Sequence, residues 1–235
     1  MPHSAVRSSE KGQHLSTLQA MWPYLYDGFT LTLVLLLCSA VLALALGTVL
    51  AGMRVSPVVP LRAFGTSYVN LFRNTPLVVM FILVVEGLPV LDVRPTLPGL
   101  DVFEVLAVLA LSVYTASFVC EALRSGVNTV DPGQAEAARA VGMTFGQTLS
   151  LIVMPQAFRA VIPPLASVFI ALAKNTSVAA VFGVTEATFQ LSRMIEATVA
   201  PPLVCFLTIA VGYMLIVWAI SGASAVVEKQ VRAAR

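Results

Sequence analysis

Five long apolar runs follow one another along the chain. They cover residues 28–53, 63–85, 103–123, 160–185 and 203–227. A helix needs about 20 mostly apolar residues to cross the hydrocarbon core of a bilayer, and barrel strands would instead alternate in polarity. The pattern predicts an all-α integral membrane protein with about five transmembrane helices. Arg73 interrupts the second run and Lys174 the fourth, and Lys174 leaves open whether the fourth run is one helix or two shorter ones.

Composition supports lipid as the main solvent of the chain. Hydrophobic residues make up 58% of the sequence and charged residues only 11%, whereas soluble domains carry roughly 25% charged residues. The net charge of +2 does not indicate a nucleic-acid partner. Cys38, Cys120 and Cys205 all lie inside apolar runs and form no CxxC or Cys/His cluster, so we expect them to be structural.

The cationic residues outside the runs predict an orientation. Five spans place the two termini on opposite faces of the membrane. With the N-terminus outside, the cytoplasmic cations are Arg54, Arg62, Arg124, Arg139, Arg159, Lys229, Arg232 and Arg235, and the external ones are Arg7, Lys11, Arg94 and Arg193. The positive-inside rule favours this orientation. It divides the chain into a polar extracytoplasmic segment (1–27), a membrane domain (28–227) and a cytoplasmic tail (228–235).

The loop 131–155 is then cytoplasmic and is predicted to form two short helices joined by a turn. Asp131 is a good N-cap, Pro132 suits the first helical position, and the side chain of Gln134 can reach back to the cap. Gly142 is expected to end this helix. Thr144 and Gln147 form a second capping pattern before Pro155 and the fourth run. Such a helix pair suits docking in a groove of another protein, although these features alone fit an ordinary structured loop equally well.

Specific residues of this loop resemble a known family. Glu136-Ala137-Ala138, Gly142 and Ile152-Val153-Met154-Pro155 look like the EAA loop of ABC importer permeases. Arg73-Asn74-Thr75-Pro76, Tyr114, Glu121 and Lys174-Asn175-Thr176-Ser177 resemble the signatures of the polar amino-acid (HisMQ-like) permeases within that group. The sequences Arg-Asn-Thr-Pro and Ala-Leu-Ala-Lys-Asn-Thr most resemble those of actinobacterial glutamate permeases.

The resemblance implies a type I ABC importer permease fold in a bacterial plasma membrane, with loop 131–155 as the coupling helix region. It implies two ABC ATPase subunits, a second permease subunit (homologous or identical) and an extracellular amino-acid-binding protein as partners. The substrate would be a polar amino acid, glutamate first and glutamine or aspartate next. The residues expected to couple to the ATPase are Gln134, Glu136, Ala137, Ala138, Gly142 and Pro155.

No phosphate-binding loop of the G-x-x-x-x-G-K-[ST] type occurs in the sequence. We therefore expect a non-catalytic subunit that binds no cofactor of its own. ATP and magnesium would reside in the partner subunits.

Two triplets inside the runs are candidates for the substrate path: Arg73-Asn74-Thr75 and Lys174-Asn175-Thr176. A charge within a span is costly and usually faces a cavity or a partner. One hypothesis is that the two cations line the translocation path and attract the carboxylate of a passing amino acid. The alternative is that they pair internally with Glu86 or Glu121, or with backbone carbonyls, and hold the bundle together.

Two other functions are open to a chain with several membrane spans. An intramembrane enzyme would need reactive groups within the spans, but His3 and His14 both lie in the polar N-terminal segment. A secondary amino-acid transporter is the stronger alternative, because the two cation-Asn-Thr triplets suggest a repeat. The residues around them do not otherwise repeat.

Five glycines lie within or beside the apolar runs, namely Gly47, Gly52, Gly65, Gly183 and Gly212. Small residues let transmembrane helices approach closely. We expect these glycines at helix crossings.

Overall fold

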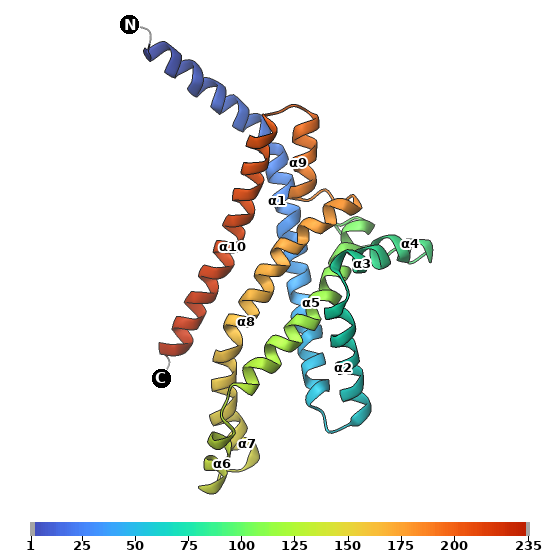
Figure 1. Cartoon of the computed structure of the whole chain (residues 1–235), viewed down its shortest axis with the longest axis vertical. Coiled ribbons are helices and arrows are strands. Elements are labelled where there is room, and N and C mark those ends of the chain that lie inside the picture. Colours follow the sequence, from blue (N-terminus) through green and yellow to red (C-terminus); the bar gives the residue numbers. More distant parts are fainter. Residues whose placement is uncertain (1–2, 234–235) are drawn as a thin grey trace.

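The computed structural model describes the backbone of residues 3–233 and the side chains of residues 17–230. Every named element is helical (Figure 1). In order they are α1 (His3–Val55), α2 (Val59–Asn74), α3 (Leu77–Phe81), η1 (Ile82–Glu86), α4 (Gly87–Val90), α5 (Val102–Asn128), α6 (Pro132–Ala140), α7 (Phe145–Thr148), η2 (Leu149–Val153), α8 (Met154–Asn175), η3 (Thr176–Phe182), α9 (Ala187–Glu196) and α10 (Pro202–Ala233). The predicted all-α fold is confirmed.

Four helical stretches are long and apolar enough to cross a membrane: Thr17–Val55, Val102–Asn128, Phe145–Phe182 and Pro202–Gln230. The pair Val59–Asn74 and Leu77–Val90 supplies a fifth span if it is counted as one. This agrees with the expected number of about five. The predicted boundary after residue 27 is not a helix break, because α1 runs unbroken through it. Residues 1–2 of the N-terminal segment and 234–235 of the C-terminal tail lie outside the described residues.

The second apolar run is not the single continuous helix that was expected. Its two halves meet at an angle of 109°. Proline disfavours the helical conformation of the residue before it, and Thr75, which precedes Pro76, is extended with φ −91° and ψ 130°. The side chains of Asn74 and Thr75 donate hydrogen bonds of 2.8 Å to the carbonyls of Asn70 and Leu71, and so satisfy acceptors at the helix end.

The fourth run is one span. The helix continues through Lys174, tightens into a 3-10 turn after Asn175 and ends at Gly183, which has φ +82°. On its N-terminal side the same span passes without interruption through η2 and α7. The loop 131–155 therefore joins the fourth span directly.

Helix α5 forms the centre of the bundle. Its start is fixed by a capping box, in which Glu104 N–H donates to Asp101 (2.8 Å) and Asp101 N–H donates to Glu104 (2.9 Å). It packs against α1 and α8 (Figure 1), and Leu106, Leu111 and Leu172 are fully buried in the shared apolar cluster. By contrast, α10 has the smallest buried share of the four continuous spans.

The two ends of the bundle carry different elements. The short helices α6 and α7 lie at one end, and α9 packs beside α1 and the start of α10 at the other (Figure 1).

Candidate functional site: a polar cavity and a helical hairpin

The hairpin of α6 and α7 begins with a capped helix. The Asp131 carboxylate accepts a hydrogen bond of 2.8 Å from the N–H of Gly133, and Pro132 occupies the first turn as predicted. The expected return bond from the side chain of Gln134 to the cap is wrong. Instead, the Gln134 N–H donates to the Asp131 carbonyl (3.0 Å) and its side chain is exposed.

The turn between the two helices forms as predicted. Gly142 adopts φ +92°. The N–H of Met143 donates to the Ala138 carbonyl (3.1 Å), which is the bond pattern of a glycine-terminated helix. Thr144 and Gln147 then form a complete capping box, with the Thr144 N–H donating to Gln147 at 2.9 Å.

The hairpin exposes most of the residues expected to couple to an ATPase. Gln134, Glu136, Ala137, Gly142 and Pro155 are exposed, whereas Ala138 is buried within the chain. Sequence reasoning missed two apolar side chains at the tip, Val141 and Phe145, which are 80% and 74% exposed. Exposed apolar side chains of this size form a surface that another protein could cover.

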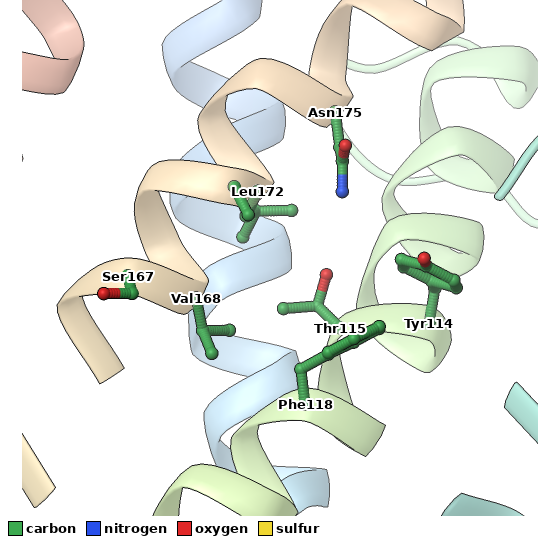
Figure 2. A pocket seen from close by; sticks show the side chains of 8 residues that line it. Tyr114, Thr115, Phe118, Ser167, Val168, Leu172 and Asn175 are labelled. Carbon is green, nitrogen blue, oxygen red and sulfur yellow. The ribbon is translucent and has the colours of Figure 1, made fainter. Parts of the chain in front are cut away.

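A cavity of about 390 Å³ lies between α5 and α8. Its lining residues are Tyr114, Thr115 and Phe118 on α5, and Ser167, Val168, Ala171, Leu172 and Asn175 on α8. Figure 2 shows the Thr115 hydroxyl and the Asn175 amide directed into the space between the two helices. This volume falls in the lower range of small-molecule sites, roughly 300–1,000 Å³.

Two polar groups of the cavity are available to a ligand. Thr115 is only 3% exposed. Among the described side chains, neither the Thr115 hydroxyl nor the Asn175 amide has a hydrogen-bond partner. Asn175 is half-buried. Both groups can therefore bond to a polar solute or to water that enters the cavity.

The Arg73 triplet divides between the cavity and the helix end. The Nη1 atom of Arg73 lies 3.8 Å from Oε2 of Glu121, and its guanidinium carbon lies 5.6 Å from the ring centroid of Phe118, a cavity residue. Asn74 and Thr75 instead bond to the carbonyls of α2. The internal pairing with Glu121 that formed the alternative hypothesis is therefore present, and Arg73 also touches the cavity wall.

The second triplet contributes one residue to the cavity. Asn175 lines it. Lys174 is exposed on the isolated chain, and Thr176 is fully buried with its hydroxyl bonded to the Ala173 carbonyl (2.8 Å). Thr115, Phe118 and Ser167 were not singled out from the sequence. A small polar residue inside each of two apolar runs was the available signal.

Comparison with known proteins places these features in a family. Residues 43–233 match the family model described as binding-protein-dependent transport system inner membrane component. The chain belongs to this family. Glutamate transport system permease protein GluC of Corynebacterium glutamicum is 45% identical over 210 residues, which cover 86% of this chain and 92% of that protein. Glutamate/aspartate import permease protein GltK of Escherichia coli O157:H7 is 37% identical over 174 residues, or 73% of this chain and 77% of that one.

A solved structure agrees with the family assignment. The crystal structure of an amino acid ABC transporter with histidines superimposes with a TM-score of 0.78 at 28% identity, covering 88% of this chain and 94% of that one. The permease is therefore a multi-pass membrane subunit of the ABC transporter type.

The permease contains one further polar centre, at the end that carries α9. Glu186 is fully buried and caps α9, because its Oε1 accepts from the N–H groups of Thr188 (2.8 Å) and Phe189 (3.1 Å). Its Oε2 accepts from the hydroxyls of Thr32 (3.3 Å) and Tyr213 (2.5 Å). One carboxylate thus ties α9 to α1 and α10. The sequence does not single it out, because the fourth apolar run ends at residue 185.

Proposed function

We propose that this chain forms the translocation path for glutamate, or for glutamine or aspartate, in an ATP-driven importer. The observation that carries the proposal is the cavity between α5 and α8 (Figure 2), where the hydroxyl of the buried Thr115 and the amide of the half-buried Asn175 have no partner among the described side chains. The printed names of the similar permeases, which specify glutamate, support the substrate class.

The cavity suits the chemistry of an amino acid. The Thr115 hydroxyl and the Asn175 amide can each donate or accept a hydrogen bond, and the side chains of Val168 and Leu172 provide an apolar wall for the carbon chain. Of the two sequence triplets, Asn175 is assigned to the substrate path directly and Arg73 through its contact with Phe118. Asn74, Thr75 and Thr176 act by holding helix ends, and Lys174 lies beside the path.

The hairpin of α6 and α7 is assigned to the ATPase interface. Two ABC ATPase subunits would bind its exposed tip, with Gln134, Glu136, Ala137 and Gly142 beside Val141 and Phe145. Pro155 lies in the first turn of α8, so a displacement of the hairpin moves the helix that carries Asn175. ATP and magnesium are bound by the partner subunits in this proposal, and this chain binds no cofactor.

The remaining partners follow from the two ends of the bundle. With the N-terminus outside and the C-terminus inside, the hairpin lies in the cytoplasm and α9 faces the outside, where an amino-acid-binding protein would deliver substrate. A second permease subunit, homologous or identical, completes the path in a bacterial plasma membrane.

The test is glutamate uptake into liposomes that contain the assembled complex, its binding protein and internal ATP. Thr115→Val and Asn175→Leu should each lower the uptake rate at least fivefold, because each removes a polar group from the cavity. Thr48→Val is the matched control, since this exposed α1 hydroxyl bonds only to the Leu44 carbonyl of its own helix. Uptake that continues without ATP under an imposed ion gradient would instead establish a secondary transporter.

A further inference from the structure

Glu121 on α5 is shared by two arginines from different helices. Its Oε1 pairs with Nη1 of Arg54, in the last turn of α1. Its Oε2 lies 3.8 Å from Nη1 of Arg73, in the last turn of α2. Two cations and one carboxylate leave this cluster with a net charge of +1.

The two arginines are held very differently. The Arg54 side chain is only 9% exposed, and its Nη1 also lies 3.9 Å from Sγ of Cys120. Gly65 leaves room for it, because a Cβ at that position would lie 2.9 Å from Cγ of Arg54. The Arg73 side chain is 45% exposed. Arg54 is therefore the fixed partner of Glu121, and Arg73 is the partner that can leave.

Arg73 is also the arginine that reaches the cavity wall. Its guanidinium packs over the ring of Phe118, and Phe118 lines the cavity together with Thr115 and Asn175. A long ion pair with a half-exposed partner is weak. Because Glu121 keeps Arg54, the departure of Arg73 would not leave the half-buried Glu121 carboxylate unpaired.

We propose that Arg73 exchanges Glu121 for a carboxylate of the transported amino acid. This inference rests on the proposed function. Before the exchange one positive charge of the cluster is uncompensated. Afterwards Arg54 pairs with Glu121 and Arg73 pairs with one substrate carboxylate, so every charge of the cluster has a partner in a region where isolated charges are costly. Glutamate offers an α-carboxylate and a side-chain carboxylate, and the experiment distinguishes them.

The experiment measures equilibrium binding of radiolabelled glutamate to the purified complex of permease and ATPase subunits in lipid nanodiscs, without the binding protein. Arg73→Gln should weaken binding at least tenfold, and Arg73→Lys should recover most of it because it restores the charge. Glu121→Gln should tighten binding severalfold, since Arg73 then has no competing carboxylate. Arg94→Gln is the matched control, because Arg94 is 64% exposed and pairs with Asp92 in the loop before α5.

Competition identifies which carboxylate Arg73 binds. Glutamine retains only the α-carboxylate and isoglutamine only the side-chain carboxylate. Against the wild-type complex, the carboxylate that the weaker competitor lacks is the one that Arg73 binds. The difference in affinity between the two competitors should vanish in Arg73→Gln.

Opposite effects at Arg73 and Glu121 are the signature of exchange, whereas a purely structural ion pair predicts the same loss from both neutralisations. Equal losses from Arg73→Gln and Glu121→Gln overturn the inference, as does wild-type binding by Arg73→Gln. If Glu121→Gln does not assemble, the contrast between Arg73→Gln and Arg73→Lys decides: equal weakening overturns the inference. ATP-dependent uptake by the wild-type complex would leave the proposed function intact in each of these cases, and its absence would remove both.

Discussion

Removal of the Glu186 side chain should loosen the end of the bundle that carries α9. In Glu186→Ala, two of the four donors to the carboxylate retain other acceptors. The Thr32 hydroxyl already bonds to the Gly28 carbonyl (3.0 Å), and the Tyr213 hydroxyl lies 3.1 Å from that of Thr188. The N–H groups of Thr188 and Phe189 lose their acceptor.

The cost follows from what remains unpaired and what becomes empty. Loss of a helix N-cap costs about 1 kcal/mol. The cavity left by truncating a fully buried side chain costs about 2 kcal/mol more, at the low end of large-to-small core substitutions. The sum of about 3 kcal/mol corresponds to a fall in Tm of about 6–12 °C for a chain of this size.

Glu186→Gln separates the shape of the side chain from its charge. The amide oxygen can still accept from the two N–H groups of α9, and its NH₂ group can donate to the hydroxyls of Thr32 and Tyr213, which can also accept. We expect a loss below about 1 kcal/mol, because volume and hydrogen bonds are retained.

Thermal unfolding can be followed with a thiol-reactive fluorogenic dye in detergent. Cys205 and Cys120 are buried, and Cys205 belongs to the same apolar cluster as Ala187 and Met194 of α9. The exposed Cys38 is replaced by Ala in every variant to remove its background. Equal destabilisation by Ala and Gln would refute the reasoning, because it would mean that the negative charge, and not the packed set of hydrogen bonds, stabilises this end. An unchanged Tm in Glu186→Ala would refute it as well.

Two further glycine substitutions test the hairpin and the helix crossing beside it. Gly142→Trp should leave the spans inserted but lower the amount of glutamate transported per ATP hydrolysed severalfold, because φ +92° disfavours a side chain and the position is exposed at the hairpin. The control is Gly222→Trp on α10, where a side chain also meets open space. Normal coupling in Gly142→Trp would contradict the docking assignment. Gly126→Val should lower the stability by about 1–3 kcal/mol in the same dye assay, since a Cβ there lies 2.1 Å from Cγ2 and 3.0 Å from Cα of Val161 on α8. Gly52→Val is its control, because a Cβ at that position meets nothing within 4 Å. Equal Tm values for Gly126→Val and Gly52→Val would show that α5 and α8 can move apart without loss of stability.

The hairpin could be predicted in detail because its determinants are local. The cap at Asp131, the left-handed Gly142 and the Thr144–Gln147 box each depend on residues within three or four positions. The bend in the second span also has a local cause in Pro76. The run of apolar residues continues through that proline, so hydropathy alone does not predict the angle of 109° between the two helices.

Helix crossings and the cavity could be predicted only in part, because they depend on which faces meet. Gly47, Gly65 and Gly212 do lie at close approaches, where a Cβ would come within 3 Å of Val119, Arg54 and Phe29. Gly52 meets nothing, and Gly183 ends a helix with a positive φ. All five look alike in the sequence. Thr115 and Asn175 likewise become a pair only once α5 and α8 are side by side.

The position of Glu186 relative to the apolar runs does not reveal that its side chain is buried. It follows the fourth run by one residue, which is where a solvated loop is expected. After the helix of the fourth span ends at Gly183, α9 packs against α1 and α10 and buries the carboxylate completely. Burial of a carboxylate is tolerated only where donors surround it, and here two backbone and two side-chain donors come from three helices. Because those donors are 154 residues upstream in one case and 27 downstream in another, the polar centre at this end arises from tertiary packing, whereas the hairpin at the opposite end arises from local sequence.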